Sequence, residues 1–316
     1  MKKSNINIMF TGAGGPVSVS IIKLIREAGY GIVGVDTEKD AVGGLFCDSF
    51  YRVPKANHAD YIDTILSVCD RERVRLIVPG VDEELIALGR TRERFLNRGI
   101  DIVLSDQKVI EICNDKHEMF LYSKEKGFPS PNTYLPKEIK KPDVLTYPLI
   151  VKPKVGRGSR DIYNVNNENE LLFFSRYVNE PIIQEYLGGQ EYTVDMLSNR
   201  QGEVLAIVPR KRLLSKGVSI KGVVDMNPEI IHACRVIAES LPLSGPSNIQ
   251  LFLNNGSFKI VEINPRLSGT VILTVMAGLN IPVEIIRMYM DENYTFRFGQ
   301  IKDKLMIQRY WQEIIQ

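Results

Sequence analysis

Short apolar runs alternate with segments of helical periodicity through the first hundred residues. Each run has the length of one buried strand, and the segments between them repeat apolar positions every three or four residues. This pattern predicts a parallel α/β layer, which we expect to form a Rossmann-like domain over residues 1–110. The expected strands are Ile6–Phe10, Ile32–Val35, Leu76–Val78 and Ile100–Leu104, and the expected helices are Val17–Ala28, Tyr61–Cys69, Gln107–Ile112 and Lys116–Lys126.

The pattern changes after a proline-rich connection, Phe128–Pro148, that favours at most one short strand. Strands now follow one another through turns rich in Asn and Gly, at Ser198–Gly202 and Leu253–Gly256, which indicates antiparallel pairing and a mixed α+β fold. The expected strands are Leu149–Lys152, Ile182–Tyr186, Tyr192–Ser198, Val204–Arg210, Ile249–Leu253, Phe258–Ile263 and Leu305–Ile315, and the expected helices are Glu168–Tyr177, Pro228–Glu239 and Thr270–Ala277.

Composition narrows the class of protein. The 316 residues are 44% hydrophobic and 25% charged, with a formal net charge of +2. These values are typical of soluble globular proteins, and we expect neither a membrane span nor nucleic-acid binding. Four widely spaced cysteines favour free thiols in a reducing cytoplasm over a zinc site or disulfides. A small-molecule partner is therefore expected.

A first glycine loop, Gly12–Pro16, follows the first strand and opens a helix. Such a turn can hold an anion on backbone amides, and Asp36 lies near the position of a ribose-binding acid. These features favour a nicotinamide or flavin site, as in an oxidoreductase. However, Val17 occupies the position of the third glycine of that fingerprint. A structural turn or a substrate-facing loop is the alternative that we prefer.

A second glycine loop follows the strand that ends in Lys152. Lys152 at the mouth of an apolar strand, with Gly156, Gly158 and Ser159 beyond it, suits a loop that covers a triphosphate. The glycines give this loop the freedom to act as a lid. A solvated hairpin turn explains the glycines but not the lysine. The loop lacks the Gly-Lys-Ser/Thr ending of a Walker motif.

The next strand ends in a hinge that can read an adenine edge through its backbone, Gln184–Leu187, and Glu191 behind it can accept from ribose hydroxyls. Ordinary hairpin residues are the alternative.

An acidic hairpin comes last. The period of two places Glu262 and Asn264 on one face with Phe258 and Ile260, which predicts a buried carboxylate that needs a partner. With Gln250 on the facing strand, three oxygen donors suit Mg²⁺, and an ion pair of Glu262 with Lys152 is the alternative. Arg266 follows directly and can face charge on a transferred phosphoryl group.

In this order the motifs resemble the ATP-grasp superfamily, especially the carbamoyl-phosphate synthetase large subunit and stand-alone amino-acid ligases. The resemblance covers almost the whole chain and implies a small lobe over residues 111–185 and a large lobe over residues 186–316. The motifs that carry it are Asn114-Asp115-Lys116, Leu149 to Pro153, the Gly156–Ile162 loop, Gln184-Glu185-Tyr186 with Glu191, Gln250, and Glu262 to Arg266.

The resemblance also implies roles for residues. ATP phosphates would contact Lys116 and Lys152 under the loop of Gly156, Gly158 and Ser159. Adenine would lie on Gln184, Glu185, Tyr186 and Leu187, ribose on Glu191, and Mg²⁺ or Mn²⁺ on Gln250, Glu262 and Asn264. Arg210, Lys211 and Arg212 end a strand and would point at phosphate or acceptor, with a solvated charge run as the alternative.

The implied reaction is ATP-dependent ligation of a carboxylate to an amine through an acyl phosphate, with release of ADP. A small carboxylate such as an amino acid would lie between the first domain and the large lobe, held by Arg210, Arg212 and Arg266. A homodimer is compatible with this class. The alternative within the family is an enzyme that forms carboxyphosphate or carbamoyl phosphate, although one grasp unit is half of what a complete synthetase large subunit contains.

Overall fold

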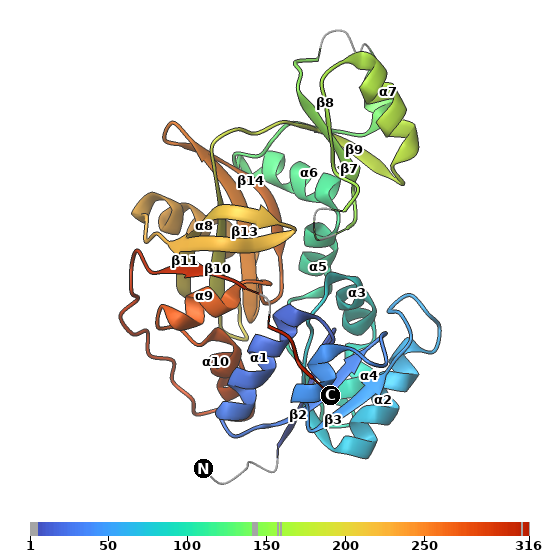
Figure 1. Ribbon diagram of the computed structural model, residues 1–316, viewed down its shortest axis with the longest axis vertical. Coiled ribbons are helices and arrows are strands. Elements are labelled where there is room, and N and C mark those ends of the chain that lie inside the picture. The colour runs from blue at the N-terminus through green and yellow to red at the C-terminus, as the bar shows by residue number, and fades with distance from the viewer. Residues whose placement is uncertain (1–5, 141–144, 157, 159, 311, 316) are drawn as a thin grey trace.

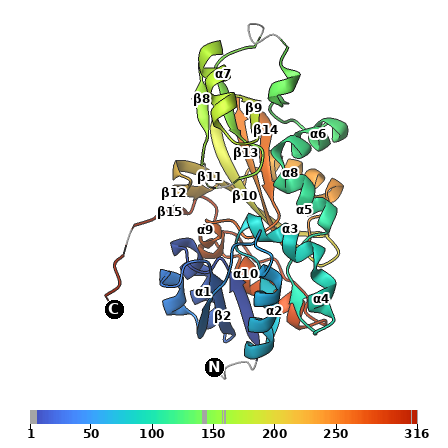
Figure 2. The same cartoon turned by 90° about the vertical axis from the view of Figure 1, so that its right-hand side faces the viewer.

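The computed structural model describes residues 6–140, 145–156, 158, 160–310 and 312–315 and contains three β-sheets (Figure 1). A five-stranded sheet forms one end of the molecule, a six-stranded sheet the middle, and a four-stranded sheet the other end (Figures 1 and 2). This arrangement confirms the predicted class, a parallel α/β layer followed by a two-lobed fold with antiparallel sheets.

The five-stranded sheet is entirely parallel, with strand order β3-β2-β1-β4-β5. Its β1 strand is buried on both faces, with Ile8, Met9 and Phe10 at most 1% exposed, as expected when helices cover both sides. The elements are β1 (Asn7–Thr11), α1 (Pro16–Glu27), β2 (Gly31–Asp36), η1 (Val42–Phe46), β3 (Ser49–Arg52), α2 (Tyr61–Glu72), β4 (Val74–Val78), α3 (Asp82–Arg90), α4 (Arg92–Leu96) and β5 (Asp101–Ile102).

Two helices, α5 (Gln107–Asn114) and α6 (Lys116–Lys126), connect this sheet to the four-stranded one. Asp115 caps α6 by accepting from the backbone N–H groups of His117 and Glu118, and Gly127 ends the helix in the left-handed region. The four-stranded unit has the order β6-β9-β7-β8 and is covered by α7. Its elements are β6 (Thr133–Tyr134), η2 (Pro136–Glu138), β7 (Leu149–Pro153), β8 (Tyr163–Val165), α7 (Glu168–Tyr177) and β9 (Pro181–Glu185).

The six-stranded sheet is antiparallel, with the order β14-β13-β10-β11-β12-β15. Both predicted hairpins are present, since β10 pairs with β11 and β13 pairs with β14. The elements are β10 (Gln190–Ser198), β11 (Val204–Lys216), β12 (Val218–Val224), α8 (Pro228–Ser240), β13 (Pro246–Asn254), β14 (Ser257–Asn264), α9 (Val271–Met276), α10 (Ile281–Met290) and β15 (Met306–Gln308).

One hydrophobic core joins the first sheet to the six-stranded sheet. Ile22 and Ile25 of α1 pack in the same buried cluster as Val208 of β11 and Ile285 and Ile286 of α10. The α10 helix, which the sequence pattern did not predict, lies beside α1 (Figure 1). The C-terminal part of the chain therefore returns to the first sheet and packs against it.

Two strand predictions are wrong. The strand expected to end at Arg210 continues to Lys216, because an unpredicted neighbour, β12, supplies hydrogen-bonding partners as far as that residue. The last strand, expected over Leu305–Ile315, is limited to Met306–Gln308, where β12 supplies hydrogen-bonding partners. Described residues beyond it leave the sheet, and the chain extends away from the body (Figure 2).

None of the helices in the described part of the chain is both long and apolar enough to traverse a bilayer. The four cysteines are free thiols, three of them buried.

Candidate active site

Two adjoining cavities occupy the junction of the three sheets. The first, here named the inter-sheet cavity, has a volume of about 260 Å³ and lies between the four-stranded and six-stranded sheets. The second, here named the switch-point cavity, has a volume of about 510 Å³ and lies between the six-stranded sheet and the carboxyl ends of β1 and β4. The two cavities share Gly158, Arg160, Arg212, Gly217, Gln250 and Glu262.

Lys152 comes from β7 and lines the inter-sheet cavity although it is only 4% exposed. Burial lowers the pKa of its ammonium group to about 8; attraction to Glu262 opposes this change, and repulsion from Lys116 adds to it. No ion pair within 4 Å joins Lys152 to Glu262, both of which the structure describes, so the expected alternative of a direct structural pair is not observed. Lys152 is therefore a buried cation with space beside it, in the inter-sheet cavity, for an anionic ligand.

Lys116 lies at the first turn of α6 and is tied to the second glycine loop. Its Nζ donates to the carbonyl of Gly156 at 2.8 Å, and its backbone N–H donates to the carbonyl of Lys154 at 2.9 Å. Gly156 and Gly158 also line the inter-sheet cavity, and Gly158 has a positive φ of 67°. Ser159 and Arg157 lie outside the described residues. The predicted loop residues that are described thus border the cavity that contains Lys152.

The predicted adenine hinge lines the same cavity. Gln184 is buried and donates to the Thr133 hydroxyl at 2.9 Å, while Glu185 pairs with Lys259 at 2.5 Å. Tyr186 and Leu187 continue the lining toward β10. These side-chain contacts fix the end of β9 to β6 of its own sheet and to β14 of the six-stranded sheet. The backbone of residues 185–187 is left as the edge that a flat ligand would meet.

Glu191, Arg212 and Gln250 form a connected group on three adjacent strands. The Nη1 atom of Arg212 lies 2.9 Å from Glu191 Oε1 and donates to Gln250 Oε1 at 3.2 Å. Its Nε donates to the Ser215 hydroxyl at 2.9 Å. Burial raises the pKa of Glu191, although attraction to Arg212 opposes the shift. Arg212 thus faces the cavities, in agreement with its predicted direction, and is held from two sides.

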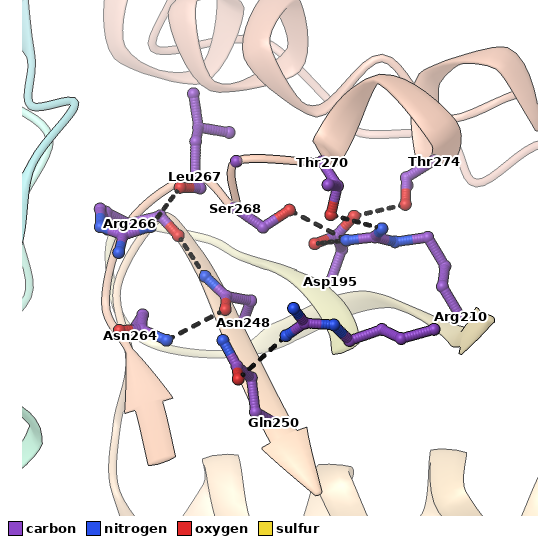
Figure 3. Close-up of polar contacts among 12 residues, drawn as sticks. Asp195, Arg210, Asn248, Gln250, Asn264, Arg266, Leu267, Ser268, Thr270 and Thr274 are labelled. Carbon is purple, nitrogen blue, oxygen red and sulfur yellow. Dashed lines mark hydrogen bonds and ion pairs between the residues drawn. The ribbon is translucent and has the colours of Figure 1, made fainter. Parts of the chain in front are cut away.

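The predicted metal set fits Mg²⁺ in part. Asn264 donates through Nδ2 to Asn248 Oδ1 at 3.2 Å (Figure 3). The same Nδ2 atom donates to Glu262 Oε1 at 3.2 Å, so the Oδ1 atom of Asn264 is left for a cation. Glu262 supplies the carboxylate oxygen that a hard cation prefers. The Gln250 oxygen instead faces the Arg212 guanidinium, which makes it the weakest of the three ligands. No group of three His, Cys, Asp or Glu side chains with metal-binding geometry occurs among the described residues.

The prediction that Glu262 is buried or nearly so holds only in part, since its side chain is half-buried. Its partner strand shifts register between Gln250 and Leu251, so Val261 is an extra residue that interrupts the alternation. Ile260 and Ile263 both enter the core at 2% exposure or less, while Glu262 and Asn264 are only half-buried and line the switch-point cavity. The bulge therefore turns both donors out of the core and into the cleft.

Arg210 does not line either cavity, contrary to its predicted direction. It is 1% exposed, and its Nη2 lies 2.8 Å from Asp195 Oδ1 and 3.0 Å from the Ser268 hydroxyl. Its Nη1 donates to the Thr270 hydroxyl at 2.7 Å (Figure 3). Arg210 lies on the same face of β11 as Arg212, two residues along, but the turn that carries Ser268 and Thr270 covers it. Arg210 supports the turn after β14 and does not reach a ligand directly.

Arg266 lies at the border of the switch-point cavity and is held by an acid that sequence reasoning missed. Its Nε donates to Asp82 Oδ1 at 2.8 Å, and its Nη2 pairs with Asp82 Oδ2. Asp82 begins α3, and the acidic run of Asp82, Glu83 and Glu84 is a helix-start signal that could have located it. Asp195 was missed too, although a carboxylate inside an apolar strand signals a buried partner.

The first glycine loop closes on Asp36. The backbone N–H of Gly14 donates to Asp36 Oδ2 at 2.7 Å, and a side chain at Gly14 would collide with this carboxylate. An acid that is bound to its own loop is a poor partner for a ribose diol. The loop and residues Gly80 and Val81 line the switch-point cavity, at the position where an open parallel sheet binds ligands.

Sequence and structure comparisons agree with this architecture. Residues 178–310 match the family described as ATP-grasp in the biosynthetic pathway with Ter operon, and residues 8–103 match the PylC-like N-terminal domain. The chain has the ATP-grasp fold, and its residues 178–310 match an ATP-grasp family model. It is 23% identical over 292 residues to the carbamoyl phosphate synthase large chain of Clostridium acetobutylicum, a match that covers 83% of this chain and 26% of that protein. The chain thus spans about a quarter of that relative.

Two solved structures show the same fold. The biotin carboxylase domain of the Hydrogenobacter thermophilus 2-oxoglutarate carboxylase, crystallised with MgADP, ADP and bicarbonate, has a TM-score of 0.76 at 18% identity and covers 95% of this chain and 73% of that one. The L-amino acid ligase of Bacillus licheniformis has a TM-score of 0.73 at 16% identity and covers 92% of this chain and 75% of that one. The chain is therefore similar to ATP-grasp proteins with different substrates.

Proposed function

We propose that the chain is a Mg-ATP-dependent ligase that joins a small carboxylate, such as an amino acid, to an amine through an acyl phosphate and releases ADP. The observation that carries this proposal is the junction of the two cavities at Arg212, Gln250 and Glu262. A nucleotide in the inter-sheet cavity would present its phosphates at this junction, and an acceptor in the switch-point cavity would meet them there.

The inter-sheet cavity suits a nucleotide because it combines a backbone edge with two lysines. The backbone at Glu185 to Leu187 would hold adenine, and Glu191 would accept from ribose. Lys152 and Lys116 would neutralise the phosphates beneath the loop of Gly156, Gly158 and Ser159. Because Lys152 is buried and has no ion-pair partner within 4 Å among the described residues, an anion placed beside it gains more than it would at the surface.

The metal would be held by Glu262 and Asn264, with Gln250 as a third, weaker ligand. Bound Mg²⁺, or Mn²⁺ in its place, would supply positive charge that stabilises the negative charge on the phosphates. Asn264 is oriented for this role by its two amide hydrogen bonds. Arg212, whose Nη2 has no hydrogen bond to any described residue, would donate to the transferred phosphoryl group or to the acceptor.

The proposed reaction has two steps. A carboxylate oxygen of the acceptor attacks the γ-phosphorus, the bond to the β,γ-bridging oxygen breaks, and ADP leaves. An amine then attacks the acyl carbon, inorganic phosphate leaves, and the amine loses a proton to solvent. Positioning and charge neutralisation supply the catalysis, so the chain need not provide a nucleophile.

An enzyme of the carbamoyl-phosphate synthetase kind is the alternative that one observation favours. Gln250 occupies the position where that branch of the superfamily has a glutamine, and the sequence match to its large chain covers most of this chain. The nicotinamide-dependent alternative is weakened because Asp36 is bound to Gly14. We propose a cytoplasmic location, and the assembly as a homodimer stays a prediction.

A substrate screen tests the proposal. Amino acids and small carboxylates, each with and without amine partners, should include at least one pair that stimulates release of ADP and phosphate in equal amounts. Glu262→Gln serves as the inactive control. Release of AMP and pyrophosphate would contradict the acyl-phosphate mechanism. Turnover driven by bicarbonate and ammonia alone would instead establish the carbamoyl-phosphate alternative.

A further inference from the structure

The guanidinium of Arg266 is fixed along its whole length. Both oxygens of Asp82 accept from its Nε and Nη2, and its Nη1 donates to the carbonyl of Leu267 at 2.9 Å. Its own carbonyl accepts from Asn248 Nδ2 at 3.1 Å (Figure 3). A two-point pair between guanidinium and carboxylate sets orientation as well as distance. Arg266 is therefore oriented before any ligand binds.

Asp82 also has a fixed position, because hydrogen bonds to the side chain of Glu84 hold the loop that precedes it. The buried carboxylate of Glu84 accepts from the backbone N–H groups of Gly80 at 3.0 Å and Val81 at 3.1 Å, and it pairs with the Thr11 and Tyr61 hydroxyls. Asp82 follows directly at the start of α3. The first sheet thus presents one carboxylate to the six-stranded sheet from a loop with little freedom.

Arg266 has two acids within its surroundings. It pairs with Asp82, and it lines the switch-point cavity together with Glu262, whose carboxylate accepts from Asn264, two residues before Arg266. Glu262 is the carboxylate that we assign to magnesium. An arginine paired with Glu262 would neutralise it and occupy the place of the cation, as expected for competition between two cations for one carboxylate.

We propose that Asp82 is a positioning residue that holds Arg266 away from Glu262 and so keeps the metal site open. This inference rests on the proposed function for the identity of the metal site. It assigns the first sheet a part in keeping the metal site open, in addition to the place beside the acceptor that its strand ends suggest. Because Gly80 and Val81 line the switch-point cavity, the same loop also borders the acceptor.

The first test is the binding of magnesium nucleotide to Asp82→Asn, measured by calorimetry. This variant keeps the size of the side chain and removes its charge. The affinity for Mg-ADP should fall by about 10- to 100-fold, the usual range for a residue that orients a metal site, while the affinity for ADP in the presence of a chelator should stay unchanged. Equal loss with and without magnesium would overturn the proposal.

Removal of the competing arginine supplies a readout that a merely structural role would not produce. In the double variant Asp82→Asn/Arg266→Gln, Glu262 has no guanidinium to pair with, so Mg-ADP affinity should recover relative to Asp82→Asn. A further loss in the double variant would contradict the proposal. Asp101→Asn is the matched control, since Asp101 also joins the first sheet to the six-stranded unit, through Arg200 at 3.0 Å, at a distance from both cavities.

A nucleotide-free crystal structure of Asp82→Asn separates this proposal from the proposed function. Arg266 should turn from residue 82 toward Glu262, and an Arg266 that keeps its position would overturn the inference whatever the protein binds. If the wild-type protein does not bind Mg-ADP, the proposed function fails, and the crystal structure still decides whether Asp82 restrains Arg266.

Discussion

The guanidinium of Arg210 lies 2.8 Å from the carboxylate of Asp195, and both side chains are only 1% exposed. Asp195 also accepts from the Thr274 hydroxyl, and Arg210 donates to Ser268 and Thr270 (Figure 3). The pair thus connects β10 and β11 to the turn that follows β14, the strand that carries Glu262 and Asn264. We expect its loss to affect folding first, and the cleft only through that turn.

Arg210→Met should lower the free energy of unfolding by about 3–5 kcal/mol, because it leaves Asp195 buried without a partner. Urea denaturation measures this change. Arg200→Met is the control, since the Arg200–Asp101 pair is 38% and 24% exposed, and its loss should cost less than about 1 kcal/mol. Equal effects of the two variants would contradict a special role for the buried pair.

Glu262→Gln should lower magnesium-dependent turnover by about 100-fold or more, because it removes the only carboxylate of the metal set. Folding should be preserved, since Glu262 is only half-buried and lines the cleft. Activity as a function of magnesium concentration measures the effect, with Glu203→Gln on an exposed turn as control. Normal kinetics in a folded Glu262→Gln protein would remove this residue from the metal site.

ATP affinity should fall as pH rises above about 8, the pKa to which burial lowers Lys152. Below that pH the unliganded ammonium is charged and attracts phosphate; above it the charge is lost, and affinity falls by up to about tenfold per pH unit. Calorimetry between pH 7 and 10 measures this profile. Lys152→Arg, which stays charged, should flatten it, and Lys152→Ala should weaken binding by about 10- to 100-fold at pH 7. The same slope in wild type and Lys152→Arg would contradict the assignment.

Mg-ATP should protect the backbone amides around the second glycine loop. Lys116 contacts the Gly156 carbonyl, and phosphate bound by Lys116 and Lys152 would draw this loop over the cavity. Hydrogen exchange of Val155, Gly156 and Gly158 should slow on addition of Mg-ATP. Exchange in the β10–β11 turn, Asn199–Gly202, should not change. Equal rates with and without nucleotide at the loop would show that it is no lid.

The parts of the fold that follow from local pattern could be predicted. The parallel sheet, both hairpins and the lysine at the end of β7 each depend on residues close together in the sequence. The α10 helix and β12 could not be assigned in this way. The apolar residues of α10 pack in one cluster with those of α1, and β12 pairs with β11. Both elements can therefore be recognised only once these partners are placed in the fold.

The site shows the same limit. Sequence pattern placed Glu262 and Asn264 on one face, but the bulge at Val261 decides that this face meets the cleft. Pattern also treated Arg210 and Arg212 alike, although contacts with Asp195 and with the turn after β14 enclose only Arg210. Asp82 had no apparent connection to Arg266, because the two are 184 positions apart and meet only through packing of the first sheet on the large one.

A thermal-unfolding series with nucleotides tests the central claim most directly. Mg-ATP should stabilise the protein, by about 2.7 kcal/mol at a hundred times its dissociation constant, and the effect should diminish in Lys152→Ala and Glu262→Gln. NAD(H) and NADP(H) should leave the unfolding temperature unchanged. Stabilisation by nicotinamide cofactors and not by Mg-ATP would contradict the assignment of the cleft to ATP.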